Sequence, residues 1–169
     1  VGLNREASEY GGIDANKIEV VTNGSNVELF SARKKNQELL KSLGLENKFI
    51  IGHVGRFNIQ KNHEFIIKVF YEIKKRNEDS ALVLVGAGEL EEKIKEIVKS
   101  LNLTESVIFL GSRDDVNNIM QVFDIFLFPS IFEGLGVVLI EAQAAGIKCF
   151  ASTAVPKEAK VTYLLSYLS

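Results

Sequence analysis

Short apolar runs rich in β-branched residues recur along the chain, and charged amphipathic segments separate them. The runs are near-continuous rather than alternating with polar residues. That pattern is typical of strands in a parallel sheet, because helices cover both faces of such a sheet. The runs predicted as strands are 18–22, 49–54, 81–85, 107–110, 125–128 and 147–151.

Most of the segments between these runs have the periodicity and the terminal residues of helices. Predicted helices span 63–76 after an Asn62 cap, 89–101, 116–123, and 137–145 closed by Gly146. A further helix over 32–43, ending at Gly44, is so charged that we expect it on the surface. Strands that alternate with helices predict an α/β domain with a doubly wound parallel sheet.

Length and charge narrow the class of protein further. At 169 residues the chain fits one domain. Its formal charge of −2 provides no basic field for a nucleic acid or an anionic membrane, so any anion must be bound locally. The longest stretches without a charge have nine residues, whereas a membrane helix needs about 20 apolar residues. We therefore expect no transmembrane segment in this chain.

Several weaker signals favour structural interpretations. A single cysteine, Cys149, fits a reducing cytoplasm and is expected to serve packing. The two histidines form no cluster with metal-ligand spacing, and His53 is expected to be a hydrogen-bonded core residue. The turn 86–88 lacks the third glycine of a dinucleotide fingerprint. The sequence also lacks the context of a serine nucleophile.

The loop that follows the run 49–54 combines two cations with a helix start. It reads Gly55-Arg56-Phe57-Asn58-Ile59-Gln60-Lys61-Asn62. Ligands of doubly wound sheets bind at the carboxyl ends of the strands, and a helix N-terminus adds free N–H donors. Arg56 and Lys61 therefore suit a phosphate or diphosphate. The alternative is that Arg56 pairs with a nearby carboxylate and Lys61 is a solvated surface charge.

The loop that follows the run 125–128 carries carboxylate and glycine residues. It reads Pro129-Ser130-Ile131-Phe132-Glu133-Gly134-Leu135-Gly136, and a helix containing Glu141 follows. The glycines let backbone approach a ligand, and the carboxylates can accept hydrogen bonds from hydroxyls. A sugar or ribose fits this chemistry. Alternatively, Glu133 complements the helix dipole and Glu141 is a surface residue.

These motifs together resemble the C-terminal domain of group 1, family 4 retaining glycosyltransferases, which have the two-domain GT-B fold. The glutamates Glu133 and Glu141 have seven residues between them, and this spacing is the family's best-known motif. The turns 23–26 and 85–88 also resemble family turns, and the resemblance covers about residues 17–152 in the same order.

The resemblance implies a Rossmann-like domain that binds a UDP-, GDP- or ADP-sugar without a metal or other cofactor. Arg56 and Lys61 would contact the diphosphate, Glu133 the sugar hydroxyls and Glu141 the ribose. The implied catalytic residues are Glu133, Arg56 and Lys61. The implied donor-binding residues are Gly55, Arg56, Lys61, Gly134, Leu135, Gly136 and Glu141. The acceptor would be a polysaccharide or a lipid-linked glycan.

The same resemblance predicts the domain organisation. Residues 1–16 would be a connecting segment and 17–169 a donor-binding domain truncated at its C-terminus, with the acceptor-binding N-terminal domain missing. We expect 161–169 to lack the closing strand and helices of a complete protein. The segment 153–158 departs from the family's paired-glycine loop, which puts part of the donor contact in doubt. The expected location is the cytoplasm, with peripheral contact to the inner membrane face through the missing domain.

Two other classes remain open at this point. A nicotinamide-dependent dehydrogenase would share the sheet but needs a complete glycine fingerprint, which is not found. A non-catalytic nucleotide-binding or interaction module would keep the fold with an inactive site. Binding of a nucleoside diphosphate would favour the transferase over both.

Overall fold

The computed structural model describes residues 26–32 and 34–168, and within them it has one six-stranded parallel sheet. The strands are β1 (Phe49–Val54), β2 (Ser80–Val85), β3 (Val107–Phe109), β4 (Ile125–Phe128), β5 (Lys148–Ser152) and β6 (Leu165–Leu168). The helices are α2 (Gln37–Ser42), α3 (His63–Arg76), α4 (Glu91–Ser100), α5 (Val116–Met120) and α6 (Val137–Ala144). Short 3₁₀ turns are η2 (Ile59–Lys61), η3 (Thr104–Ser106) and η4 (Lys157–Ala159).

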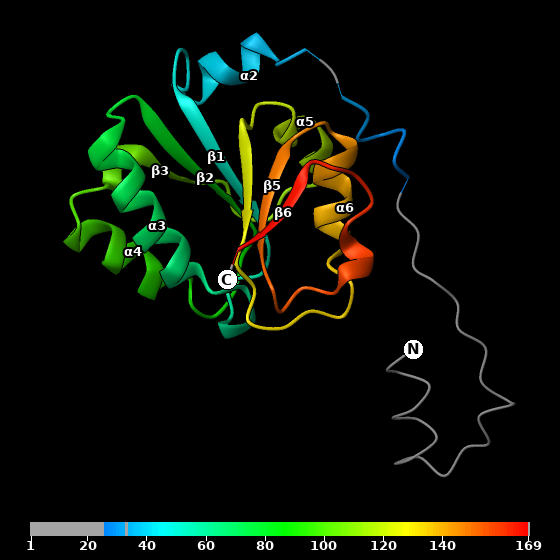
Figure 1. The fold of residues 1–169 in the computed structure, drawn as a ribbon. Helices are drawn as coiled ribbons and strands as arrows, with labels where there is room; N and C mark the ends of the chain where they lie inside the picture. Colours follow the sequence, from blue (N-terminus) through cyan, green and yellow to red (C-terminus); the bar gives the residue numbers. More distant parts are fainter. Residues whose placement is uncertain (1–25, 33, 169) are drawn as a thin grey trace, which may run out of the picture.

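The strand order is β3-β2-β1-β4-β5-β6, so the chain crosses from one half of the sheet to the other between β3 and β4 (Figure 1). All five pairings are parallel, which confirms the predicted doubly wound α/β fold. β1 and β4 are neighbours in space although they are far apart in the sequence. The loops that follow them therefore flank the point where strand order reverses, which is where such sheets bind ligands.

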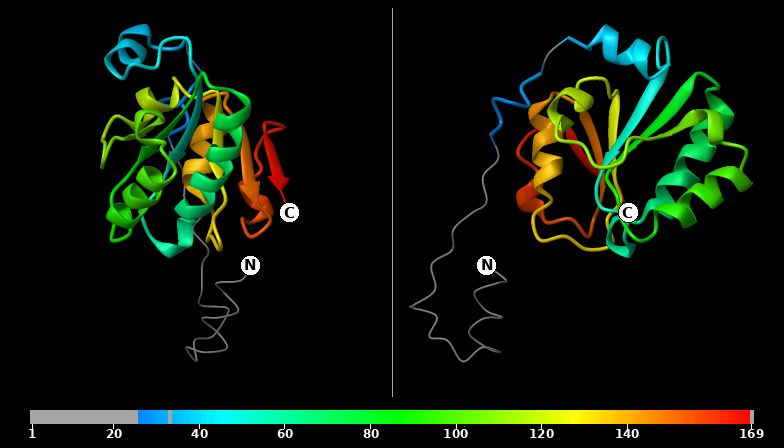
Figure 2. Two further views of the ribbon diagram at one scale, coloured as in Figure 1. Left: turned by 90° about the vertical axis from the view of Figure 1, so that its left-hand side faces the viewer. Right: turned by 180° about the vertical axis from the view of Figure 1, so that it is seen from behind.

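Helices cover the two faces of the sheet, and each face has its own apolar core (Figures 1 and 2). On one face, Ile51 and Leu84 pack with Phe70 of α3 and Ile94 of α4. The other face includes Phe126 and Cys149 together with residues of α5 and α6. Alternate residues of each strand thus enter opposite cores, which explains why the runs are apolar at nearly every position.

Asp124 aligns the two strands at the point where the order reverses. Its Oδ2 accepts a hydrogen bond from Ile50 N at 2.8 Å, and its Oδ1 accepts one from Lys35 Nζ at 2.7 Å. The preceding Phe123 lies against the backbone of β1, because a Cβ placed on Gly52 would come within 2.0 Å of its ring. These contacts fix where β1 and β4 end relative to each other.

Some sequence-based expectations differ from the structure. The prediction that 161–169 lacks a closing strand is wrong, because Leu165–Leu168 forms β6 and pairs with β5. Leu165 is 1% exposed and anchors this edge strand in the core. The surface helix expected over 32–43 is the shorter α2, which begins after an Asn36 cap. The helix expected over 116–123 ends at Met120.

Two further expectations concern the ends of the chain and the membrane. The predicted strand 18–22 and the connecting segment 1–16 lie outside the described residues. Within 26–32 and 34–168, none of the helices has the length and apolar character needed to cross a bilayer.

Candidate functional site

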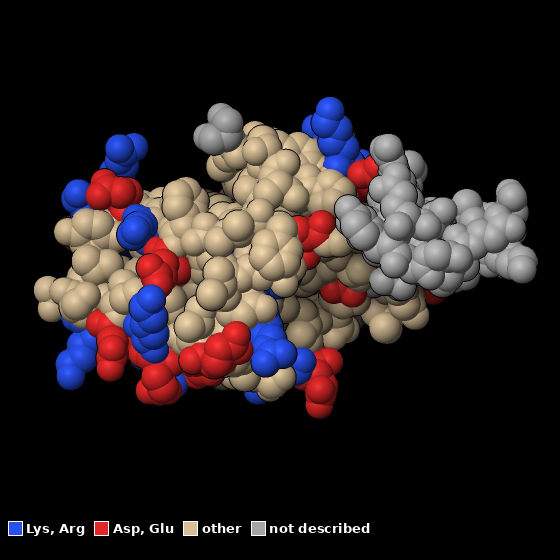
Figure 3. Space-filling model, turned by 90° about the horizontal axis from the view of Figure 1, so that it is seen from below, with Lys and Arg blue, Asp and Glu red and all other residues tan. Residues whose placement is uncertain are grey.

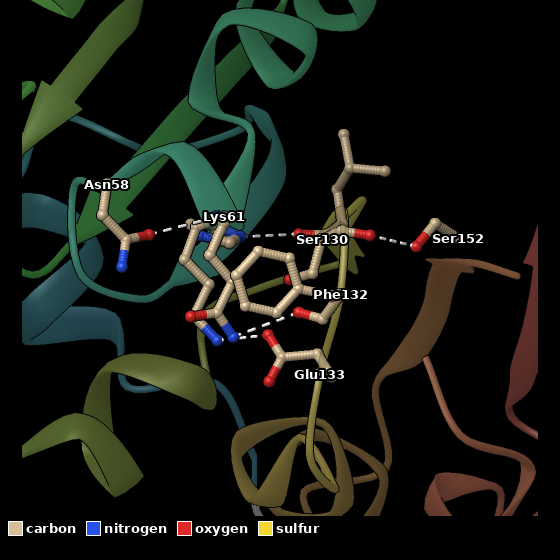
Figure 4. Close-up of polar contacts among 9 residues, drawn as sticks. Asn58, Lys61, Ser130, Phe132, Glu133 and Ser152 are labelled. Carbon is tan, nitrogen blue, oxygen red and sulfur yellow. Dashed lines mark hydrogen bonds and ion pairs between the residues drawn. The ribbon is translucent and has the colours of Figure 1, made fainter. Parts of the chain in front are cut away.

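Lys61 and Glu133 form the centre of the candidate site, which lies at the carboxyl edge between β1 and β4. Lys61 ends η2 in the loop after β1, and Glu133 lies in the loop after β4. The Lys61 ammonium donates to Glu133 Oε1 (Figure 4). The two side chains are only 15% and 6% exposed. Lys61 is therefore not the solvated surface charge of the alternative interpretation.

The ring of Phe128 forms one wall beside this ion pair. Phe128 ends β4, is fully buried, and its ring centre lies 4.7 Å from Lys61 Nζ. An ammonium over an aromatic face is stabilised by the ring quadrupole. Lys61 is thus held by a carboxylate and by an aromatic ring in a partly desolvated place, where charge interactions are stronger than in water.

Hydrogen bonds join the loop after β1 to the loop after β4 (Figure 4). Ile131 N donates to Gln60 O at 2.8 Å, and Gln60 Nε2 donates to Phe132 O at 3.1 Å. Asn62 Nδ2 donates to Pro129 O at 3.3 Å. These bonds place the chain next to Glu133 against the chain next to Lys61.

The loop after β1 is also shaped by its own residues. Asn58 Oδ1 caps η2 by accepting from Lys61 N at 3.1 Å. Asn62 adopts the left-handed conformation, with φ 56°, between η2 and α3. On the far side of the loop after β4, Ser152 Oγ donates to Ser130 O. Hydrogen bonds from polar side chains therefore help to fix the conformation of both loops.

Glycines let a third loop, 86–88, pack directly against the loop after β1. A Cβ on Gly86 would lie 2.1 Å from Gly55 O, and one on Gly88 would lie 2.5 Å from Phe57 O. Phe57 N donates to Ala87 O at 3.1 Å. Gly86 and Gly88 are thus required by the close packing of the two loops and not by a dinucleotide.

Close packing also requires a glycine at position 55. A Cβ there would lie 2.9 Å from His53 Nε2 and 3.1 Å from Lys61 Cγ. Lys61 therefore folds back over this glycine toward Glu133. In the loop after β4, Gly136 adopts a left-handed φ of 73° at the N-cap of α6, whereas Gly134 has open space around its Cβ position.

Arg56 is not joined to the ion pair. Its guanidinium lies 3.4 Å from Glu89 Oε2, and both side chains are largely exposed, at 72% and 57%. The alternative interpretation, in which Arg56 pairs with a nearby carboxylate, agrees with this geometry. Exposed pairs of this kind are weak, so the guanidinium can turn to another anion at little cost.

The other predicted residues lie in or just before α6. Leu135 is half-buried ahead of the N-cap, and Glu141 is half-buried in the second turn of the helix. The Glu141 side chain is not isolated, because Glu141 takes part in a polar or electrostatic interaction within the protein.

Two buried histidines lie beneath the loop that carries Lys61. His53 Nδ1 is 2.8 Å from Leu127 O, which confirms His53 as a hydrogen-bonded core residue, and its ring centre lies 4.8 Å from that of His63. His53 Nε2 and both ring nitrogens of His63 have no hydrogen-bond partner. Burial, and then the neighbouring positive groups, lower the pKa of His53 to about 3 and that of His63 to about 4. Both rings are therefore neutral at physiological pH.

Cys149 is also a core residue, as expected from the sequence. It is fully buried, its Sγ donates to Ile147 O at 3.2 Å, and burial raises its pKa to about 12. A thiol of this kind is inert, so Cys149 serves packing.

A cavity of about 360 Å³ opens at the carboxyl ends of β1, β2 and β3. Its lining includes Arg56 and Gly86 together with Ser112 and Arg113, which follow β3. Sequence reasoning did not include the last two residues. The rule that ligands bind after the carboxyl ends of strands could have found them, because they lie in the loop after β3 as Arg56 lies in the loop after β1.

Charge is distributed unevenly over this edge of the molecule. Seen from below, charged side chains of both signs gather on the side of α3 and α4, and the middle of the face is mostly uncharged (Figure 3). Within the described residues, His, Cys, Asp and Glu side chains do not come together in groups of three that could hold a metal ion.

Comparisons with known proteins agree with the motifs. Residues 35–162 match the family described as glycosyl transferases group 1. The chain is 36% identical to EpsF of Bacillus subtilis over 148 residues, covering 86% of the chain and 38% of EpsF. It is 37% identical over 145 residues to the UDP-Gal:alpha-D-GlcNAc-diphosphoundecaprenol alpha-1,3-galactosyltransferase of Escherichia coli, covering 83% of the chain and 38% of that enzyme.

Solved structures have the same fold. HepE of Anabaena in complex with UDP-glucose superposes with a TM-score of 0.79 at 25% identity, covering 96% of this chain and 47% of HepE. The chain spans less than half the length of each of these proteins. The family match covers most of the chain, and this chain therefore belongs to the group 1 glycosyl transferases.

Proposed function

We propose that this chain is the half of a retaining glycosyltransferase that binds a nucleotide-diphospho-sugar. The observation that carries the proposal is the Lys61–Glu133 pair, which joins the loops after β1 and β4 where the strand order reverses. The group 1 family membership and the UDP-glucose in the HepE complex support a nucleotide-sugar as the ligand.

Lys61 and Arg56 would bind the diphosphate from two sides. An ammonium has three N–H donors, so Lys61 can keep its bond to Glu133 and still donate to a phosphate oxygen. Arg56 is paired only weakly with the exposed Glu89, so it can exchange this partner for a phosphate oxygen. The cavity lined by Arg56, Ser112 and Arg113 would receive the nucleobase end of the donor.

The loop after β4 and α6 would bind the sugars. Glu133 would accept hydrogen bonds from the hydroxyls of the transferred sugar, and Glu141 from those of the ribose. Gly134, Leu135 and Gly136 would let the donor approach their backbone. The open space at Gly134 supports this assignment, because the fold itself leaves room for a side chain there.

In the reaction, the bond between the anomeric carbon and the diphosphate oxygen breaks, and its electron pair goes to the diphosphate. The acceptor hydroxyl bonds to the anomeric carbon and passes its proton to the departing diphosphate oxygen. Lys61 and Arg56 would stabilise the negative charge that develops on the leaving group, and groups already in place for that charge lower the barrier. We propose that these cations do so without a metal ion.

The acceptor proposed for the full-length protein is a lipid-linked glycan or a polysaccharide. The E. coli relative is named for an acceptor on diphosphoundecaprenol, which supports a lipid-linked glycan. The acceptor domain would lie in the part of the protein outside this chain. A lipid-linked acceptor would place the full-length protein at the cytoplasmic face of the membrane.

The test is calorimetry of the full-length protein with UDP, GDP, ADP and NAD⁺, each with and without a chelator. We expect one nucleoside diphosphate to bind, NAD⁺ not to bind, and the chelator to leave affinity unchanged. Transfer from the matching nucleotide-sugar would then be followed by NMR, with retention of the anomeric configuration expected. Binding of NAD⁺ alone would overturn the proposal, and loss of binding on chelation would overturn its metal-free part.

A further inference from the structure

Gln60 contacts the segment before Glu133 in two ways. Its backbone carbonyl accepts from Ile131 N at 2.8 Å, and its side-chain Nε2 donates to Phe132 O at 3.1 Å (Figure 4). Lys61 is the next residue along the chain, and it contacts Glu133. Two consecutive residues of one loop are thus bonded to three consecutive residues of the other.

Apolar packing does not hold this part of the loop. Ile131 is 51% exposed and Phe132 is 59% exposed. Gly134, on the other side of Glu133, has nothing within 4 Å of its Cβ position. The carboxylate of Glu133 is nevertheless nearly buried against Lys61. Hydrogen bonds therefore fix the backbone before Glu133, from the neighbouring loop at Ile131 and Phe132 and from Ser152 at Ser130.

We propose that Gln60 is a positioning residue that holds Glu133 against Lys61 through its side-chain bond to Phe132 O. This inference rests on the proposed function, in which Glu133 contacts the transferred sugar. Gln60 acts through the loop and not on the donor. Its role is to keep the carboxylate in the place that the transition state requires, which lowers the barrier without adding affinity for the ground state.

Two variants of nearly the same size separate the effect of losing the N–H hydrogen-bond donor of Gln60 from the effect of changing the shape of its side chain. Gln60→Met removes the N–H donor and keeps the length. Gln60→Glu keeps the shape, but its carboxylate faces the Phe132 carbonyl without a proton and competes with Glu133 for Lys61. The backbone bond to Ile131 N remains in both. Gln37→Met is the matched control, because Gln37 Nε2 also donates to a backbone carbonyl, Lys35 O, away from the site.

In the full-length protein we expect Gln60→Met to lower kcat about five-fold, the effect of one ordinary hydrogen bond, with donor KM changed by less than about two-fold. Gln60→Glu should lower kcat further. The melting temperature should stay the same, because the lost bond is exposed. Gln37→Met should leave all three quantities unchanged. A loss of kcat/KM that comes from a higher donor KM, with kcat unchanged, would contradict a positioning role.

A second readout does not depend on sugar chemistry. Acetylation of Lys61 by an N-hydroxysuccinimide ester, followed by peptide mass spectrometry, reports how well the ammonium is held by Glu133. We expect labelling to be about five-fold faster in Gln60→Met than in wild type or Gln37→Met. Unchanged labelling would overturn the role of Gln60 whether or not the protein binds UDP. Faster labelling in a protein that binds no nucleoside diphosphate would leave this role standing and reject the proposed function.

Discussion

The ammonium of Lys61 donates to the carboxylate of Glu133, a residue 72 positions later in the chain. The contact exists because β1 and β4 are neighbours in the sheet, so their following loops emerge side by side. Each charge is nearly buried and compensates the other. One interaction thus serves both the stability of this edge and the chemistry proposed for it.

The first prediction separates these two contributions. Lys61→Met leaves the nearly buried Glu133 without its partner, and Glu133→Gln does the same to Lys61. Each should lower the free energy of unfolding by about 1–3 kcal/mol, less than for a fully buried pair because Lys61 is 15% exposed. The double variant should recover much of this loss, since neither charge is then unpaired. Urea unfolding of the four proteins gives the coupling.

The same four proteins provide the functional control. The double variant should remain unable to bind a nucleoside diphosphate with wild-type affinity, because it lacks the cation. Additive losses of stability in the double variant would show that the two charges do not interact in solution.

The second prediction concerns Arg56. Arg56→Ala should weaken nucleoside diphosphate binding by about ten-fold or more, the effect of losing a charge-assisted hydrogen bond. Stability should not change, because the Arg56–Glu89 pair is exposed. Calorimetry at low and high salt is the measurement, with the exposed Arg76→Ala as control. Equal affinities for wild type and Arg56→Ala would remove Arg56 from the donor site.

The third prediction distinguishes the two carboxylates. Glu133→Gln should mainly reduce kcat, because its contact with the transferred sugar is proposed to strengthen in the transition state. Glu141→Gln should mainly raise the donor KM, because a ribose contact is similar in both states. Steady-state kinetics of the full-length variants decide between them. An unchanged kcat in Glu133→Gln would refute the sugar assignment.

Strand sequence predicts this fold well where both faces of a strand are buried. The run 49–54 matches β1 to the residue, because residues 50–53 are all buried. β6 was missed because Ser166 interrupts a short edge strand in which only Leu165 is buried. The surface helix was predicted too long, because its charged residues show no apolar periodicity that would mark a boundary.

The site was predictable in parts and not as a whole. The rule that ligands bind after the carboxyl ends of strands was sufficient to select Lys61 and Glu133 as candidates, since it needs no knowledge of the strand order. Their direct contact depends on β1 lying next to β4, which the sequence does not state. The bond from Gln60 to Phe132 O depends on the loop backbone, for which the residue types carry no signal.

The fourth prediction is a dependence of stability on pH. The pKa values of His53 and His63 fall from 6.5 in the unfolded chain to about 3 and about 4 in the folded protein. Below about pH 6.5 the unfolded state therefore binds more protons than the folded state. The stability that the two neutral histidines contribute is fully present above that pH and is lost as the pH falls toward their folded-state pKa values. His63→Phe removes one of these groups and keeps the stacking on Phe57.

Urea unfolding at about pH 7 and about pH 5 tests this linkage. Wild type should lose about 2 kcal/mol more than His63→Phe over this range, the contribution of one histidine whose pKa is lowered this far. Carboxylates titrate mainly below the range and are common to both proteins. Equal losses in the two proteins would show that folding does not lower the pKa of His63.

The last prediction contrasts two glycines, one required by packing and one left free by it. A Cβ on Gly52 would come within 2.0 Å of the Phe123 ring, so Gly52→Ala must displace a buried ring and should cost about 1–3 kcal/mol of stability. Gly134 has open space and no left-handed φ, so Gly134→Ala should leave stability unchanged. If the donor approaches the backbone at Gly134, the same methyl group should weaken nucleoside diphosphate binding.

The two variants should therefore show opposite behaviour in two measurements, urea unfolding and calorimetry with the nucleoside diphosphate. Gly52→Ala combined with Phe123→Leu should recover stability, because the smaller side chain leaves room for the methyl group. Normal binding by Gly134→Ala would mean that the donor does not approach this backbone. A stable Gly52→Ala protein would mean that the Phe123 ring does not lie on β1 in solution, and the alignment of β1 with β4 that brings Lys61 to Glu133 would then depend on the Asp124 hydrogen bond to Ile50 N.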